Sequence, residues 1–192
     1  MTGRTHDLAA ITALAAIVLF EPLRTVSLST ALAAILANQI GGIAPDIDQP
    51  TAPFWRNLPI GSFFGRIFDR GLGGHRFLTH SLLGVALFGV LVRLGLDFLH
   101  PLLGHIDTGL VWWAFMIGII SHLIMDSFTK EGVPWLLPLP IKFGLPPLKS
   151  LRITTGKKVE SLLVFPGLLG LAIWLFVSHY QRLLTILQNR IN

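Results

Sequence analysis

Residues 109–127 read GLVWWAFMIGIISHLIMDS, an apolar stretch whose only ionisable side chains are His122 and Asp126. Its length and composition match the ~20 residues that an α-helix needs to cross the hydrocarbon core of a bilayer. Working outward along the chain, four more apolar candidates lie at about residues 7–20, 28–44, 77–99 and 160–179. The sequence therefore predicts an all-α integral membrane bundle of about five apolar helices.

The composition agrees with this fold class, because 52% of the 192 residues are hydrophobic and only 13% are charged. One globular core could not hide several apolar stretches of membrane-spanning length, so lipid must cover them. We expect residues 1–192 to form a single membrane-embedded domain. The net charge of +5 is interpreted as a topology signal and as contacts with membrane lipids, and no nucleic-acid partner is expected.

The first two candidate helices are the weakest. Residues 7–20 are short for a span, and residues 28–44 include Asn38, Gln39 and the Gly41-Gly42 pair. They predict either two spans or a hairpin that crosses the membrane only in part. No A-x-A site follows the first apolar run, so we expect an uncleaved first span and not a signal peptide.

Two long polar segments, at about 45–76 and 128–159, are rich in Pro, Gly and basic residues and are predicted to be loops. If all five candidates span, these loops and the N-terminus share one side of the membrane. Eleven cations lie on that side: Arg4, Arg56, Arg66, Arg70, Arg76, Lys130, Lys142, Lys149, Arg152, Lys157 and Lys158. Three lie opposite: Arg24, Arg182 and Arg190. The positive-inside rule makes the loop side cytoplasmic in a multi-pass inner-membrane protein.

Polar motifs from five separate segments converge near the same cytoplasmic side. The chain has no cysteine, so any metal ion must be held by histidines and carboxylates. The candidate metal ligands are His6, Asp46, Asp48, His75, His80, His122, Asp126 and Glu160. His100, His105 and His179 fall toward the opposite side and are interpreted as ordinary interfacial or solvated histidines.

The strongest single motif is the pair His122 and Asp126. Residues at i and i+4 lie on one helical face with Cβ atoms about 5–6 Å apart, so both side chains can reach one ion. A lone Asp in hydrocarbon costs roughly 3 kcal/mol or more, which makes an intramembrane ionisable pair a functional hypothesis. The alternative is a hydrogen bond between helices.

The other motifs have structural alternatives as well. Asp46 and Asp48 follow a Gly/Pro-containing helix end, where two carboxylates can bind or bridge metals or can simply cap a turn. His75 and His80 bracket the start of the third span, either as metal ligands or as part of an interfacial basic motif. His6 and Glu160 each stand at one end of a span. Their interpretation as ligands depends on their convergence with the other motifs.

In order along the chain, these motifs are His6, Ala44-Pro45-Asp46-Ile47-Asp48, His75-Arg76-x-x-Thr79-His80-Ser81, His122-x-x-x-Asp126 and Glu160. This set resembles the YdjM-like family of inner-membrane metal-dependent hydrolases over most of the chain. That family is distantly similar to the zinc-dependent phospholipase C and P1 nuclease group, all-helical enzymes with a clustered zinc site. The sequence departs from the pattern of that group at Gly156, because that group has a histidine at this position, four residues before the glutamate.

The resemblance implies a metal-dependent hydrolase, with Zn²⁺ as the expected ion and two ions favoured. Such ions would activate water for attack on a phosphoester, carried by a small molecule, a phospholipid or a lipid-linked phosphate. Asp46 or Asp48 is the candidate bridging carboxylate or general base, and Arg76 is expected to stabilise phosphate charge. Lys157 and Lys158 are better explained by the positive-inside signal. The alternative is a non-enzymatic membrane protein, with a structural metal or polar cluster or a role in ion or proton transport.

Overall fold

A computed structural model describes residues 1–21, 26–52, 55, 61, 63, 65–66, 76–139 and 141–188, without the side chains of 187 and 188. Its helical elements, in chain order, are α1 (Gly3–Phe20), α2 (Leu28–Ile43), η1 (Ala44–Asp48), α5 (Leu82–Leu99), α6 (Thr108–Ser127), η2 (Lys149–Leu151), η3 (Glu160–Val164), α7 (Phe165–Ser178) and α8 (Tyr180–Gln188). The described residues contain two isolated β-bridges and no strand. The predicted all-α class is confirmed.

Five of these helical stretches are long and apolar enough to cross a membrane: Gly3–Phe20, Leu28–Asp48, Leu82–Leu99, Thr108–Ser127 and Glu160–Ser178. At 1.5 Å per residue each is roughly 27–32 Å long, close to the thickness of the hydrocarbon core. Only 17% of the α5 span and 11% of the α7 span are buried in protein, whereas half of α6 is buried. The apolar faces of α5 and α7 are therefore suited to lipid, and α6 is the central helix.

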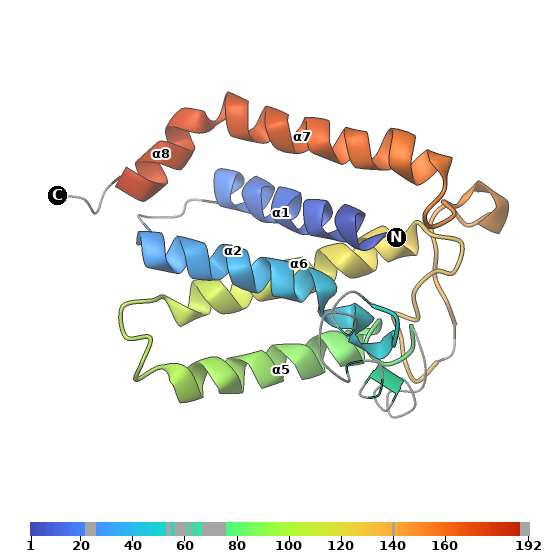
Figure 1. Ribbon diagram of the computed structural model, residues 1–192, viewed down its shortest axis with the longest axis horizontal. Coiled ribbons are helices and arrows are strands. Elements are labelled where there is room, and N and C mark those ends of the chain that lie inside the picture. The colour runs from blue at the N-terminus through green and yellow to red at the C-terminus, as the bar shows by residue number, and fades with distance from the viewer. Residues whose placement is uncertain are drawn as a thin grey trace.

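Successive helices alternate in direction, so different segments of the chain lie at the two ends of the bundle (Figure 1). The N-terminus lies beside the last turns of α6, and η1, the turn before α5 and the segment that follows α6 lie at that same end (Figure 1). The α5–α6 connection and α8 lie at the opposite end. The end of the bundle that contains the N-terminus is called the loop end below. It brings together segments that the sequence assigns to one side of the membrane.

Close packing of α2 against α6 sets the position of η1. A Cβ on Gly118 would collide with the backbone carbonyl oxygen of Asn38, and a Cβ on Gly41 would collide with that of Phe115. The Asn38 side chain donates a hydrogen bond to the Ala114 carbonyl at 3.0 Å. Small residues at such a contact let helix backbones approach closely, as is common in membrane bundles. As a result, α2 ends directly against α6.

The third span starts later than expected. The sequence predicts a helix from residue 77, but α5 begins at Leu82 because Ser81 is its N-cap and accepts a hydrogen bond from the Gly84 N–H at 3.1 Å. Residues 76–80 form turns instead. Arg76 has a φ of 60°, in the left-handed region that residues other than glycine rarely adopt. His80 therefore precedes α5 and lies in a turn. Helix α8 was not expected, because a search for long apolar stretches passes over its polar sequence.

Candidate metal centre

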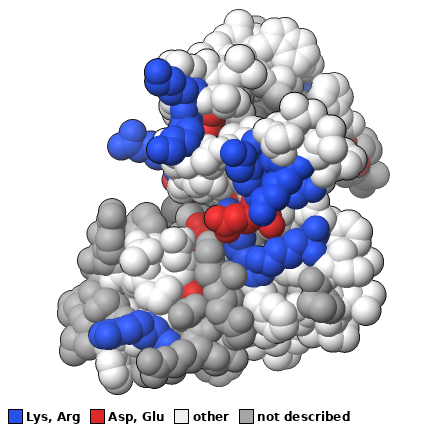
Figure 2. Space-filling view, turned by 90° about the vertical axis from the view of Figure 1, so that its right-hand side faces the viewer, with Lys and Arg blue, Asp and Glu red and all other residues white. Residues whose placement is uncertain are grey.

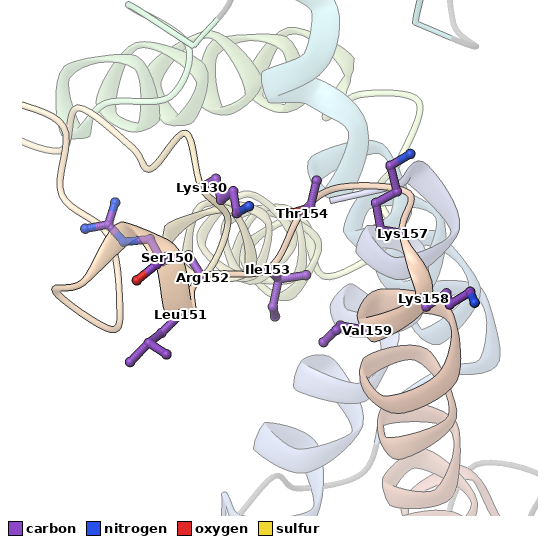
Figure 3. Close-up of a pocket in the computed structure, with 9 residues that line it drawn as sticks. All are labelled: Lys130, Ser150, Leu151, Arg152, Ile153, Thr154, Lys157, Lys158 and Val159. Carbon is purple, nitrogen blue, oxygen red and sulfur yellow. The ribbon is translucent and has the colours of Figure 1, made fainter.

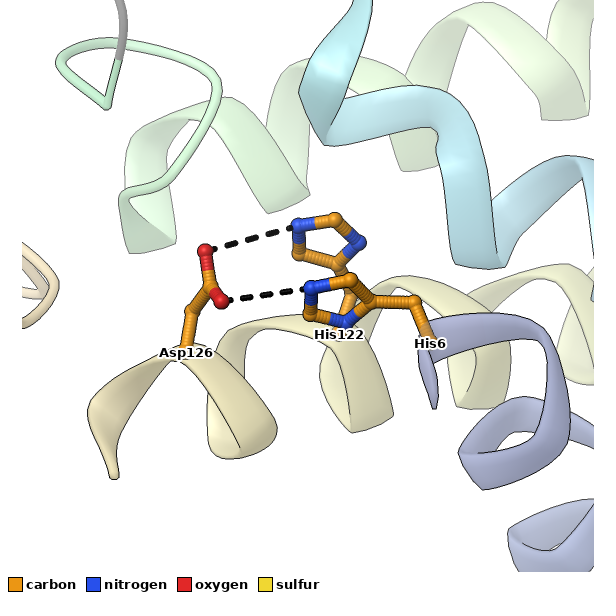
Figure 4. A group of neighbouring side chains, drawn as sticks. All are labelled: His6, His122 and Asp126. Atoms are coloured by element: carbon orange, nitrogen blue, oxygen red, sulfur yellow. Dashed lines mark ion pairs between the residues drawn. The ribbon is translucent and has the colours of Figure 1, made fainter. Parts of the chain in front are cut away.

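His6, His122 and Asp126 form the first of two groups that can hold a metal ion. Each residue offers one ligand atom, and these three atoms all lie within 4.8 Å of one another. His6 comes from the first turn of α1, and the other two residues come from adjacent turns of α6 (Figure 4). His6 Nε2 lies 3.2 Å from Asp126 Oδ1, and the His6 and His122 rings stack with their centroids 3.6 Å apart. The i, i+4 pair predicted on α6 thus faces a third donor from α1.

Asp46, His80 and His122 form the second group, so His122 belongs to both. Asp46 lies on η1, and its Oδ1 is 3.8 Å from His80 Nε2 and 3.6 Å from His122 Nε2. The two histidines are fully buried, whereas the Asp46 side chain is 22% exposed. Asp46 is therefore the member of the two groups through which the cluster meets its surroundings.

The orientation of His122 is set by the backbone of α2. Its Nδ1 lies 2.6 Å from the Gly42 carbonyl oxygen. A carbonyl can only accept, so Nδ1 carries the proton and donates. In the neutral ring this leaves the Nε2 lone pair directed toward two carboxylates, at 3.6 Å from Asp46 Oδ1 and 3.8 Å from Asp126 Oδ2. Metal-binding histidines commonly donate their other ring N–H to a carbonyl in this way.

Asp48 lies behind the second group and supports it. Its Oδ2 accepts hydrogen bonds from the Thr79 hydroxyl and, at 3.0 Å, from the Arg76 backbone N–H, and lies 3.4 Å from His80 Nδ1. The same Thr79 hydroxyl lies 3.0 Å from His80 Nδ1. Asp48 therefore orients the turn that carries His80, and it is not a member of either group of potential ligands.

Arg76 is buried, with 5% of its side chain exposed, and it contacts Asp126 directly. Its Nη2 lies 2.6 Å from Asp126 Oδ2, and its Nη1 donates to the Thr129 hydroxyl at 2.8 Å. The Met1 ammonium also contacts Asp126. Two cationic groups therefore stabilise the Asp126 carboxylate, and the unusual backbone conformation of Arg76 occurs where its side chain enters the cluster.

Glu160 does not join either group of potential ligands. Its Oε1 accepts hydrogen bonds from the Thr2 N–H, the Thr2 hydroxyl and the Thr5 hydroxyl, each at 2.7 Å. Its Oε2 accepts the Gly156 N–H, also at 2.7 Å. The buried carboxylate thus joins the start of α1 to the start of the last span. His75, the remaining predicted ligand, lies outside the described residues.

Sequence similarity places this fold and cluster among known proteins. The family model described as "YdjM inner membrane protein" matches residues 1–187. The chain belongs to the YdjM inner membrane protein family. It is 31% identical over 168 residues to the uncharacterized protein YvsG of Bacillus subtilis, covering 85% of this chain and 88% of that one. It is 32% identical over 109 residues to the inner membrane protein YdjM of Escherichia coli, an alignment that covers 54% of this chain and 48% of that protein. No solved structure matches.

Membership of the YdjM family and the five apolar helices make this chain a multi-pass protein of the inner membrane. The family description and the name of the Escherichia coli relative give a location and no reaction, so the chemistry of the cluster has to be argued from its geometry. Its surroundings at the loop end are strongly charged. Acidic side chains lie near the centre of that face, with lysines and arginines on either side (Figure 2).

The histidines interpreted as ordinary lie away from the cluster. His100 and His105 belong to the α5–α6 connection, and His179 follows α7. The partners that sequence reasoning missed are backbone and hydroxyl groups, namely the Gly42 carbonyl and the hydroxyls of Thr2, Thr5 and Thr79. Of these, only Thr79, next to His80, stands inside a motif that the sequence already indicated. The others become visible only when the helices are packed.

Proposed function

We propose that this YdjM-family protein is a membrane-embedded metal-dependent hydrolase that acts on a phosphoester at the cytoplasmic face. The observation that carries the proposal is the orientation of His122. With Nδ1 donating to Gly42, a proton on Nε2 would have no acceptor within hydrogen-bond distance among the described residues, whose nearest carboxylate oxygens are 3.6 and 3.8 Å away. A lone pair facing two carboxylates is instead the arrangement that a bound cation requires.

The residues present fit a divalent metal ion by the chemistry of their donors. His122 Nε2 is buried and makes no hydrogen bond to any described residue. Buried polar atoms without partners are costly, and an ion is one of the few groups that can satisfy nitrogen lone pairs and carboxylates together. Imidazole and carboxylate donors without thiolates suit zinc. His122 offers a single lone pair, on Nε2, so it can bind one ion, and a second ion would have to be held by the other donors.

Metal ions bound in this way act as Lewis acids and lower the pKa of coordinated water. The chain's own residues have distinct parts in the proposal. His6, His80, His122 and Asp126 would hold the metal, and Asp48 orients His80. Asp46, the partly exposed carboxylate, is placed to take a proton from water or to bridge two ions. Arg76 balances Asp126, since its guanidinium is already engaged by that carboxylate.

The position of the cluster suggests the substrate class. It lies at the loop end of the apolar helices, where we expect lipid headgroups to meet the bundle, and cations surround the acidic side chains of that face (Figure 2). Arginine and lysine side chains attract phosphate groups. We therefore infer a substrate whose phosphate is presented at the membrane surface, such as a phospholipid or a lipid-linked phosphate.

The proposal is tested with purified protein in detergent or nanodiscs, by elemental analysis and by hydrolysis of phospholipid and nitrophenyl phosphoester substrates. We expect stoichiometric zinc or a similar divalent ion and an activity that chelators remove and the metal restores. Asp46→Asn should abolish the activity while the protein stays folded, and His100→Ala at the opposite end should leave it unchanged. Protein that contains no divalent metal and takes up neither Zn²⁺ nor Mn²⁺ would contradict the proposal.

A structural role for the cluster is the second candidate, and one observation favours it. The cluster joins α1, η1, the turn before α5, and α6, and Arg76 and Met1 already contact Asp126. This role predicts bound metal without hydrolysis, together with a large loss of thermal stability on chelation. Transport is less well supported, because the potential ligands belong to the start of α1, η1, the turn before α5 and the last turns of α6, which all lie at one end of the bundle (Figure 1).

A further inference from the structure

The segment between α6 and the last span contains a second unusual surface, which does not depend on the metal centre. Residues 136–151, here called the apolar loop, carry seven large hydrophobic side chains that are 42–65% exposed. They are Leu136, Leu139, Ile141, Phe143, Leu145, Leu148 and Leu151. Loops normally cross protein surfaces with polar side chains, and such a concentration of exposed apolar groups marks a binding surface.

The loop is held in place by hydrogen bonds at its base. Val133 and Phe143 exchange backbone hydrogen bonds at 2.8 and 2.9 Å, and the Leu145 N–H donates to the Ser127 carbonyl at the end of α6 at 2.7 Å. Farther along, Arg152 Nε donates to the Pro146 carbonyl at 2.8 Å. These bonds satisfy the backbone and leave the apolar side chains facing outward. The exposure is therefore a property of an ordered loop.

The charges around the loop are almost all of one sign. From residue 128 to residue 159 the chain has six cations, namely Lys130, Lys142, Lys149, Arg152, Lys157 and Lys158, against the single acid Glu131. A hollow of about 640 Å³ lies between the loop and the start of the last span, with four of these cations in its lining. Lys157 and Lys158 point away from each other and from Arg152, so the cations spread over a surface and do not converge on one anion (Figure 3).

We propose that the apolar loop inserts into the cytoplasmic leaflet of an anionic bilayer beside the bundle. Both of its flanking helices are membrane spans, so the loop lies close to the lipid interface. Large hydrophobic side chains gain free energy when they leave water, and each Lys or Arg near an anionic surface adds electrostatic attraction. Apolar side chains with a basic surround are the combination that interfacial segments use.

The absence of cysteine from the chain makes a site-specific test direct. Leu148→Cys and, as a second position, Ile141→Cys are labelled with an environment-sensitive fluorophore and reconstituted in phosphatidylcholine vesicles with or without phosphatidylglycerol. Thr155→Cys, exposed in a polar turn of the same segment, is the matched control. A melting temperature equal to that of the parent protein identifies the variants that fold normally.

We expect the Leu148 and Ile141 labels to shift to blue emission and to be quenched by lipids brominated on their acyl chains, more strongly when phosphatidylglycerol is present. The Thr155 label should respond to aqueous iodide instead. Labels at 148 and 141 that remain open to iodide would overturn the proposal. Labels shielded from both quenchers would also overturn it, because they would indicate a covering protein or a second copy. Quenching that is identical in both kinds of vesicle would overturn the assignment to anionic lipid. None of these outcomes depends on hydrolysis.

Discussion

His122 and Asp126 lie one turn apart on α6, and His122 alone belongs to both groups of potential ligands. Replacing a residue that hydrogen-bonds to a metal ligand typically lowers metal affinity 10–100-fold. We expect His122→Ala to lower zinc affinity by more than this, as measured by competition with a chelator. The effects of substituting two ligands of one ion are not additive, so adding Asp126→Ala to His122→Ala should lower the zinc affinity little further. Full metal occupancy in the double variant would remove both residues from the site.

Glu160 is the residue for which sequence and structure suggest different roles. Glu160→Ala would leave the Thr2, Thr5 and Gly156 donors without their acceptor, and an unsatisfied buried group costs roughly 1–3 kcal/mol. We expect a lower temperature of thermal unfolding in detergent and an unchanged metal content. Asp97→Ala, at an exposed pair with Arg93, is the control and should change neither. A folded Glu160→Gln protein that has lost its metal would return Glu160 to the ligand set.

At the scale of elements, the contact between α2 and α6 positions Asp46 and the Gly42 carbonyl beside His122. Gly118→Ala would force its new methyl group against the Asn38 backbone, and overpacking of this kind costs roughly 1–3 kcal/mol. We expect both the melting temperature and the zinc affinity to fall, because η1 would move with α2. A Cβ added to Gly95 on α5 would meet no atom within 4 Å, so Gly95→Ala should change neither quantity. Lower stability with unaltered zinc affinity would show that the site does not depend on this contact.

At the scale of the whole molecule, five alternating helices that all cross the membrane would place the two termini on opposite sides of it. Eleven cations in the segments that the sequence assigns to one side, against three in the segments on the other, predict a cytoplasmic N-terminus and an external C-terminus. Fluorescent-protein fusions should therefore be bright at the N-terminus and dark at the C-terminus. Alkaline phosphatase fused in the α5–α6 connection should be active. A bright C-terminal fusion would mean that one of the five helices does not span.

Several features of this molecule follow from local sequence because their physical causes are local. A bilayer demands about 20 apolar residues for each span, and this requirement can be read from hydropathy without knowledge of the neighbours. The shared face of His122 and Asp126 follows from the helical repeat alone. The gathering of the polar motifs at one end follows from the alternation of spans, which the structure reproduces.

Tertiary structure decided how the candidate residues divide their roles, because those roles depend on which helices touch. Asp46 and Asp48 are two residues apart and look equivalent in sequence, yet the packing of α2 on α6 turns Asp46 toward His122 and Asp48 toward Thr79 and Arg76. Glu160 meets the threonines of α1 only because the first and last spans are neighbours. No spacing along the chain encodes these contacts, since each joins segments that only the packed bundle brings together.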